Sequence, residues 1–311
     1  MKILFMGTPD FAAGILKAIV ESGRHEVVCA VTQPDRPKGR SKELIPCPVK
    51  EYAAARGIPL LQPAKIKEEQ EVAKLKGIDA DIYVVAAFGQ ILSKEILDIP
   101  KHGCINVHAS LLPEYRGAAP IQWAIADGKK VTGVTIQQMN EGVDTGDILS
   151  VSQVEIGDDE TGGSLFDRLM DEGASLIVRT LDMIEKGEAK PVPQDDSKAT
   201  YAKILKKEMG CIDFARSAEE IERMIRAFTP WPGGYTYLDG KMIKIKKCRV
   251  CQSSGDEEPG TVTGTSKDEI VVACGRGALG ISVLQSEGKK EMTVHDYLLG
   301  NPVKAGEKFG R

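Results

Sequence analysis

The chain has 311 residues, of which 42% are hydrophobic and 28% are charged, and its formal net charge is −4. This composition is typical of globular proteins, and the length favours two domains. The small negative charge excludes a protein that is basic throughout, so any contact with nucleic acid must depend on local basic patches.

We expect a cytoplasmic protein with no membrane partner. No segment approaches the roughly 18 consecutive apolar residues that are needed to cross a membrane. The opening MKILFMGTPDF has a shorter apolar run than a signal peptide and no small-residue cleavage site. We also expect a monomer.

Seven cysteines are scattered along the chain, and only Cys248 and Cys251 form a CxxC pair. A structural zinc site needs four ligands, and no second CxxC or nearby pair of histidines completes such a set. We therefore expect reduced thiols and no bound metal.

Apolar runs alternate with segments of helical periodicity over the first two thirds of the chain. The predicted strands are Lys2–Gly7, Glu26–Thr32, Asp81–Phe88, Gly103–His108 and Gly133–Met139, and the predicted helices are Asp10–Val20, Val49–Arg56, Lys67–Leu75, Pro120–Ala126 and Ser164–Lys186. Strands that are apolar on both faces and alternate with helices favour a parallel sheet covered on both sides. We predict a doubly wound, mainly parallel, Rossmann-like α/β domain over residues 1–188.

Residues 189–205 have the composition of a linker, with prolines, mixed charge and little apolar content. Beyond them one helix is predicted at Ser217–Ala227, with Ser217 as its N-cap. Short strands broken by glycine follow, at Tyr235–Leu238, Met242–Val250, Gly260–Thr263, Ile270–Ala273 and Leu279–Leu284. This pattern predicts a smaller C-terminal β-barrel, OB-like, over residues 206–311.

The segment CINVHASLLPEYRGAAP at Cys104–Pro120 is the most informative one. Asn106 and His108 are two residues apart at the end of a predicted strand, so both side chains lie on one face. Ligands of open α/β sheets bind beyond the carboxyl ends of the strands. An amide beside an imidazole can stabilise and protonate a developing oxyanion. Alone, the pair also fits two polar residues that cap a loop.

A second loop, GVDTGD at Gly142–Asp147, follows the strand at Gly133–Met139. Asp144 lies where a strand of the parallel sheet is expected to end, and its carboxylate can orient His108 or accept a proton through water. The alternative is a turn aspartate that binds its own backbone, a role that fits Asp147 better.

The first strand–helix turn, GTPDF at Gly7–Phe11, lacks the GxGxxG pattern of dinucleotide-binding proteins. Asp10 is expected to cap the following helix. Dinucleotide binding is therefore disfavoured.

The run INVHASLLP, followed by RGAAPIQWAI, resembles the signature of the formyltetrahydrofolate-dependent transferases and hydrolases. The resemblance implies 10-formyltetrahydrofolate as formyl donor, no metal, and action of Asn106, His108 and Asp144 on the formyl carbon. It further implies folate contacts, which are Ser110, Leu111, Leu112 and Pro113 together with Phe88, Gly89 and Ile91 of the FGQIL segment.

Three further segments, GTPDFA, TQPDRPKGRSKELIPCPVK and FTPWPG, resemble the branch of this family that formylates the α-amino group of methionyl initiator tRNA. In that branch the loop after the second strand meets the tRNA acceptor end, which implies tRNA contacts at Arg36, Lys38, Arg40 and Lys42. Glycine and prolines prevent a regular helix across 34–39, and the loop is more basic than acidic. Without the resemblance, a solvated surface loop is the simpler interpretation.

The segment KMIKIKKCR at Lys241–Arg249 contains five basic residues and no acidic one. In a strand Lys244 and Lys246 share one face, while Ile243 and Ile245 point into a core. The lysines can contact phosphates, as the resemblance implies for tRNA, or form an ordinary polar strand face. Alternatives for the whole chain are a formyltransferase acting on glycinamide ribonucleotide or an amino sugar, a formyltetrahydrofolate hydrolase, and a non-enzymatic tRNA-binding module.

Overall fold

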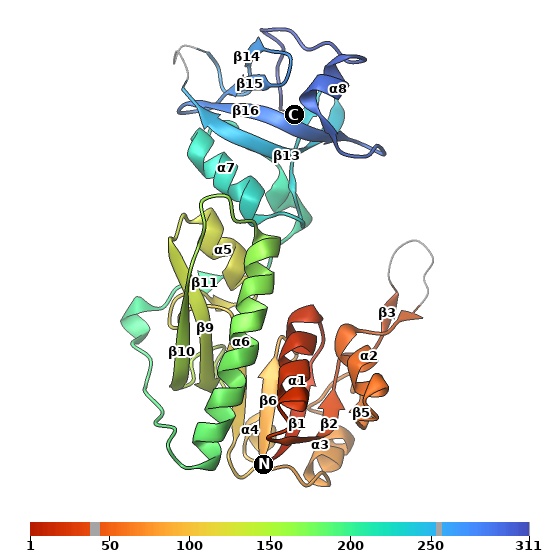
Figure 1. Cartoon of the computed structure of the whole chain (residues 1–311), viewed down its shortest axis with the longest axis vertical. Coiled ribbons are helices and arrows are strands. Elements are labelled where there is room, and N and C mark those ends of the chain that lie inside the picture. The colour runs from red at the N-terminus through yellow and green to blue at the C-terminus, as the bar shows by residue number, and fades with distance from the viewer. Residues whose placement is uncertain (38–43, 253–256, 311) are drawn as a thin grey trace. The chain divides into compact units, whose positions relative to one another are not determined.

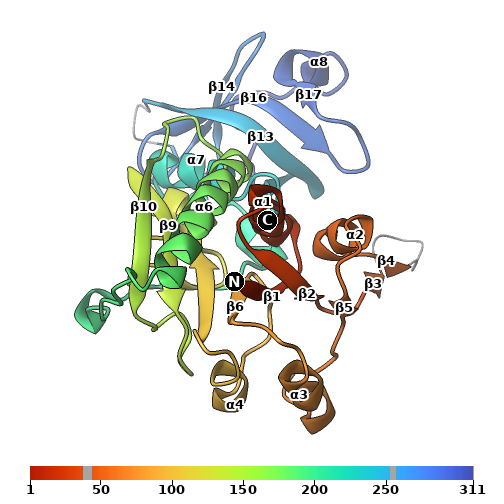
Figure 2. The same cartoon turned by 60° about the horizontal axis from the view of Figure 1, so that its bottom comes forward.

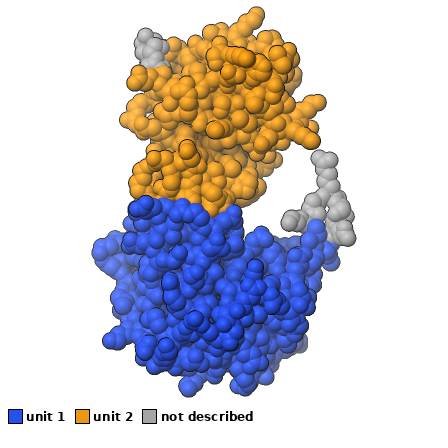
Figure 3. Space-filling model, viewed as in Figure 1, with its two compact units in different colours: residues 1–120, 131–155, 166–202 blue, residues 121–130, 156–165, 203–311 orange. Residues whose placement is uncertain are grey.

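A computed structural model describes residues 1–37, 44–252 and 257–310. The chain forms two compact units (Figure 3). The first comprises Met1–Pro120, Val131–Glu155 and Phe166–Ala202, and the second comprises Ile121–Lys130, Ile156–Leu165 and Lys203–Arg311. The second unit thus takes two short pieces that lie between segments of the first unit.

The first unit is built on a seven-stranded sheet with the order β10-β9-β7-β6-β1-β2-β5 (Figure 1). Its strands are β1 (Lys2–Gly7), β2 (Glu26–Val31), β5 (Leu60–Leu61), β6 (Ile82–Ala86), β7 (Cys104–His108), β9 (Val131–Gln138) and β10 (Ile148–Glu155). The pairings from β5 through β7 are parallel, whereas β9 is antiparallel to both β7 and β10. The predicted mainly parallel α/β class is therefore confirmed.

Helices cover both faces of this sheet, as Figures 1 and 2 show. They are α1 (Asp10–Ser22), α2 (Pro48–Ala55), α3 (Glu69–Lys76), α4 (Lys94–Leu97) and the long α6 (Gly162–Glu185). Side chains of α3 and α4 such as Val72 and Ile96 share one buried cluster with Leu4 and Tyr83 of the sheet. On the opposite face α1 buries Ile15 and Ile19, at the spacing of one helical stripe.

Two expectations for this unit are wrong in detail. The strand before Asp144 was expected to belong to the parallel set, but β9 runs the other way, and its last residue, Gln138, pairs with Ile105 near the start of β7. Asp10 does not cap α1, because Pro9 is the N-cap residue and no side chain bonds the helix end. As the first helical residue, Asp10 instead places its charge near the positive end of the helix dipole.

The second unit contains a six-stranded antiparallel sheet among its described residues, with β17 (Met292–Thr293) beside β16 and the order β12-β13-β16-β15-β14. The strands are β12 (Gly234–Leu238), β13 (Lys241–Cys251), β14 (Val262–Thr265), β15 (Ile270–Ala273) and β16 (Ala278–Ser286). Residues near the C-terminus bridge its two edges, because Phe309 pairs with Leu238 and Lys308 pairs with Thr261. The sheet therefore curls into the small barrel that the short strands predicted.

The α-helices that lie in the second unit include α5 (Pro120–Ala126), α7 (Ala218–Ala227) and the short α8 (Val294–Leu298). Ser217 caps α7 as predicted, and Glu220 closes a reciprocal capping box with it. Ile221 and Ile225 of α7 pack into the barrel core with Ile243 and Ile245. No helix in the described part of the chain is both long and apolar enough to cross a membrane.

Candidate active site

Asn106, His108 and Asp144 come together at the carboxyl end of β7. The Asn106 Nδ2 atom lies 3.4 Å from Asp144 Oδ1, and His108 Nδ1 lies 3.6 Å from the same oxygen. The first distance is that of a long hydrogen bond, and the second is in ion-pair range but too long for a hydrogen bond. Both strand side chains therefore lie on one face, as their spacing predicts. Asp144 reaches them because the loop after β9 folds back over the sheet.

The orientation of His108 follows from its second ring nitrogen. His108 is buried, and its Nε2 atom lies 2.9 Å from the carbonyl oxygen of Tyr115. A carbonyl only accepts hydrogen bonds, so Nε2 carries a proton and donates it. The neutral ring then has its lone pair on Nδ1, which faces Asp144. Nδ1 is the nitrogen that can gain and lose a proton during a reaction.

The Asp144 carboxylate is held by amide donors on both oxygens. Gln137 Nε2 lies 2.9 Å from Oδ1, and the backbone N–H of Gly117 donates to Oδ2 at 2.8 Å. Gln137 also accepts from the N–H of Gly146 at 3.1 Å and is only 2% exposed. Sequence reasoning missed Gln137, although a glutamine at the end of an otherwise apolar strand was a usable signal.

Backbone strain is concentrated around this cluster. Four non-glycine residues in the described part of the chain have positive φ. Asp144 at 53° belongs to the cluster, Tyr115 at 57° bonds His108, and Ala87 at 44° directly follows β6. The fourth, Asp239, lies in the turn between β12 and β13. Each such residue costs on the order of 1–3 kcal/mol and persists only where its surroundings impose it. Tyr115 supplies the carbonyl that orients His108, so the strained positions are tied to the polar cluster.

The Ser110–Pro113 loop is fixed from beneath by Thr135. The Thr135 hydroxyl donates to the Ser110 carbonyl at 2.7 Å and accepts from the Leu112 N–H at 3.1 Å. Ser110 is completely buried and its hydroxyl donates to the Glu114 carbonyl, while Leu112 is 6% exposed. Leu111 and Pro113 keep partial exposure. The loop is thus rigid, and only part of it offers surface to a ligand.

The second predicted folate segment follows β6. Phe88 is buried, while Gly89 is exposed and Ile91 is 62% exposed. The Phe88 carbonyl accepts from Gln33 Nε2 at 3.2 Å and from the Thr8 hydroxyl at 3.4 Å. The exposed Ile91 side chain, close in sequence to this hydrogen-bonded carbonyl, offers a surface on which an apolar ring can pack.

The basic loop after β2 is described only at its base. Arg36 is exposed in β3 (Arg36–Pro37), which pairs with β4 (Leu44–Ile45), and its Nη2 atom donates to Gln33 at 3.3 Å. The other predicted contacts, Lys38, Arg40 and Lys42, lie outside the described residues. Below the loop, Lys50 lies 2.5 Å from Asp35, so that lysine is committed to an ion pair.

In the second unit, Ile243 and Ile245 are buried, whereas Lys244 and Lys246 are partly exposed. The alternation predicted for β13 is confirmed. Farther along β13, burial raises the pKa of the Cys248 thiol to about 12. Among the described residues, no group of three or more His, Cys, Asp or Glu side chains is arranged to hold a metal ion.

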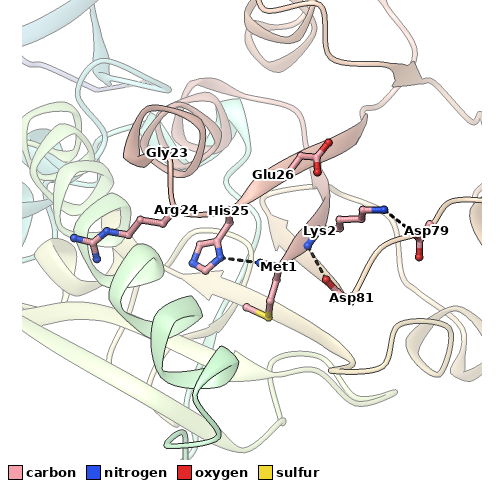
Figure 4. Close-up of a pocket in the computed structure, with 8 residues that line it drawn as sticks. All are labelled: Met1, Lys2, Gly23, Arg24, His25, Glu26, Asp79 and Asp81. Atoms are coloured by element: carbon pink, nitrogen blue, oxygen red, sulfur yellow. Dashed lines mark hydrogen bonds and ion pairs between the residues drawn. The ribbon is translucent and has the colours of Figure 1, made fainter.

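A separate pocket lies at the other end of the parallel strands (Figure 4), where Lys2 begins β1, Glu26 begins β2 and Asp81 precedes β6. The Lys2 ammonium lies 2.6 Å from Asp79, and the Lys2 N–H donates to Asp81 at 2.7 Å. These are the amino ends of parallel strands, where open α/β sheets do not place their ligands.

Both parts of the chain match known protein families. A family model described as "Formyl transferase" matches residues 1–181, and one described as "Formyl transferase, C-terminal domain" matches residues 204–302. The chain belongs to the formyl transferase family. Among its relatives, a protein named methionyl-tRNA formyltransferase from Lachnospira eligens is 51% identical over 315 residues, which covers 100% of both chains. The protein of the same name from Agathobacter rectalis is 52% identical over 309 residues and 99% of each chain.

Solved structures share the fold at low identity. HypX from Aquifex aeolicus in complex with tetrahydrofolic acid has a TM-score of 0.65 and 17% identity, over 98% of this chain and 48% of that chain. This chain therefore spans about half the length of HypX. An N-formyltransferase from Helicobacter canadensis, in complex with folinic acid and dTDP-3-aminofucose, has a TM-score of 0.65 and 18% identity, over 90% of this chain and 99% of that chain.

Proposed function

We propose that the protein transfers the formyl group of 10-formyltetrahydrofolate to the α-amino group of methionyl initiator tRNA. The observation that carries the proposal is the convergence of Asn106 and His108 on Asp144 at the carboxyl end of β7. Full-length relatives at about half identity that bear the name methionyl-tRNA formyltransferase support the same activity.

In the proposed reaction the neutral amine attacks the formyl carbon directly. A C–N bond forms to the methionyl nitrogen, the carbonyl electrons move onto oxygen, and Asn106 Nδ2 donates to that oxyanion. The C–N10 bond then breaks and its electron pair returns to the folate nitrogen. His108 Nδ1 takes the proton released by the amine and gives it to N10, because Nε2 is committed to the Tyr115 carbonyl. Asp144 stabilises the imidazolium that forms in between.

The folate contacts are proposed from the surfaces that remain open. Leu111 and Pro113 of the Ser110–Pro113 loop, with Gly89 and Ile91 after β6, offer exposed area near the polar cluster. Ser110, Leu112 and Phe88 are buried and shape the site from below. Such a mixture, apolar walls with a few fixed polar groups, is typical of small-molecule sites.

The tRNA contacts are proposed at two basic regions. One is the loop that carries Arg36, Lys38, Arg40 and Lys42, and the other is the face of β13 that carries Lys244 and Lys246. We assign residues 1–188 as the catalytic domain, 189–205 as the linker and 206–311 as the tRNA-binding domain. We further propose that the protein acts as a cytoplasmic monomer.

The test is incubation with 10-formyltetrahydrofolate and methionyl-tRNA, initiator against elongator, with formylmethionine as the product measured. We expect rapid formylation of the initiator only. Release of formate without formylmethionine would indicate a hydrolase, and formylation of glycinamide ribonucleotide or an amino sugar in its place would indicate a small-amine transferase. Tight binding of tRNA without any product would leave only a binding module.

A further inference from the structure

Gln194, in the segment that leads out of the first unit, makes four hydrogen bonds with its side-chain amide. Its Nε2 atom donates to the carbonyl oxygens of Asp144 at 2.9 Å and of Gly146 at 2.7 Å. Its Oε1 atom accepts from Arg116 Nε at 3.1 Å and from Arg116 Nη2 at 2.7 Å. Carbonyls only accept and a guanidinium only donates, so the two ends of the amide cannot be exchanged.

Arg116 is itself fixed. It is 2% exposed, and its Nη2 atom also lies 2.6 Å from Asp196 Oδ1. Its backbone belongs to β8 (Arg116–Gly117), which pairs with β11 (Tyr201–Ala202). The residues on either side of Arg116 are Tyr115, which orients His108, and Gly117, which donates to Asp144. The anchor of Gln194 is therefore continuous with the backbone that orients both catalytic side chains.

The backbone of Asp144 needs such an anchor because its φ is 53°. Asn106, Gln137 and Gly117 hold the carboxylate of Asp144, but none of them bonds its backbone. Gln194 binds the backbone carbonyl of Asp144 and that of Gly146 two residues later. The sheet thus holds the strained loop through the Asp144 carboxylate and the Gly146 N–H, and Gln194 holds it through the carbonyls of Asp144 and Gly146.

We propose that Gln194 is a positioning residue that keeps the Asp144 carboxylate in register with His108 Nδ1. Gln194 does not touch the reacting atoms and acts only through the main chain of Asp144 and Gly146. The inference rests on the proposed formyl transfer for its catalytic purpose, but the restraint on the loop can be measured without any turnover.

The decisive variant is Gln194→Glu. A carboxylate keeps both acceptor contacts with the Arg116 guanidinium, yet it cannot donate and it repels the two carbonyl oxygens. A misplacement of about 1 Å in a catalytic group can cost on the order of 10²-fold in rate. We expect kcat for formyl transfer to fall by about that factor while KM for the folate changes less than about threefold. We also expect the acidic limb of the pH–kcat profile to move, because the Asp144 carboxylate then lies at a different distance from His108 Nδ1.

The matched control is Gln153→Glu, which makes the same chemical change at an exposed position of β10. It should leave kcat and the pH profile unchanged. Amide hydrogen exchange provides the readout that is independent of activity, and residues 142–147 should exchange faster in Gln194→Glu than in either the wild type or the control.

The outcomes separate the two claims. If Gln194→Glu leaves both kcat and the exchange of residues 142–147 at wild-type values, the positioning role is wrong. A fall in the active fraction with an unchanged pH profile and unchanged local exchange also contradicts it, since that result describes general destabilisation. If the wild type formylates no amine but the loop still loosens in the variant, the restraint stands and the proposed function fails.

Discussion

The amino ends and the carboxyl ends of the strands in the first sheet both carry charged side chains, but these side chains differ in burial. At the amino ends, Lys2 and Asp79 form an ion pair whose side chains are 46% and 89% exposed. At the carboxyl ends, the side chains of His108 and Asp144 are only 7% and 15% exposed, and amide N–H groups donate hydrogen bonds to the Asp144 carboxylate. Exposed pairs contribute little and are screened by salt. The residue types alone do not identify a site, whereas the burial of the ion pair and the backbone strain at Tyr115 and Asp144 do.

Each end of the strands also carries a buried histidine. His25, at the amino ends of the strands, has Nδ1 3.3 Å from the Met1 amine, while its buried Nε2 lies 3.2 Å from Asp182 without forming a hydrogen bond. His108 has one nitrogen bound to a carbonyl, and the other faces a carboxylate beyond hydrogen-bonding distance. The two histidines therefore differ in their neighbours, because His25 lies beside the Met1 amine whereas His108 shares the Asp144 carboxylate with the Asn106 amide.

The largest loss of activity is expected from changes to His108 and Asp144. His108→Ala and Asp144→Asn should each lower kcat for formyl transfer by roughly 10²–10⁴-fold, the range for a positioned acid–base group. Their combination should cost little more than either alone, because the two residues act as a unit. Steady-state kinetics with saturating folate and initiator tRNA measures this. Near-normal turnover in a folded single variant would contradict the assigned roles.

A smaller loss is expected for Asn106→Ala. This change removes one N–H donor to the oxyanion, and such a donor is worth about 10²–10³-fold in kcat. Because Asn106 is not the proton carrier, the pH–rate profile should keep its shape while its height falls. A profile that changes shape would assign Asn106 a role in proton transfer.

The smallest effect is expected at His25, at the amino ends of the strands, and it depends on pH. Burial, and then the neighbouring Met1 amine, lower the pKa of His25 in the folded protein. The unfolded chain therefore binds more protons just below the ordinary histidine pKa of about 6.5. The stability present above that pH should be lost progressively as the pH falls below it.

Thermal unfolding between pH 8 and pH 5 tests this expectation. His25→Asn should flatten the decline in Tm over the acidic part of that range, and formyl transfer at neutral pH should stay within about twofold of the wild type. An unchanged slope would mean that other groups cause the acid sensitivity.

Much of the catalytic unit could be predicted because its patterns are local. The spacing of Asn106 and His108 fixes their common face once Gly103–His108 is recognised as a strand. Asp144 was predicted for a reason that is partly wrong, since β9 is antiparallel and the contact depends on the loop folding back. No local pattern encodes that reversal, because it depends on tertiary hydrogen bonds.

Gln137 and Gln194 show what sequence patterns leave out. A buried glutamine in a strand has the same periodicity as a surface polar residue, so its role is visible only through the donors and acceptors that surround it. Gln194 lies in a proline-containing stretch whose composition indicates only a linker. Its contacts are with residues 48, 50 and 78 positions away in the chain. Such long-range polar contacts are set by the assembled fold.

The make-up of the second unit limits how the protein can be dissected. Residues 121–130 and 156–165 belong to it although they precede the linker, and Trp123 packs edge to face on Phe228 with ring centroids 6.0 Å apart. A gene fragment that starts at residue 203 would leave this aromatic face bare and would be prone to aggregate. Chimaeras that exchange C-terminal halves between relatives must therefore carry both early segments across as well.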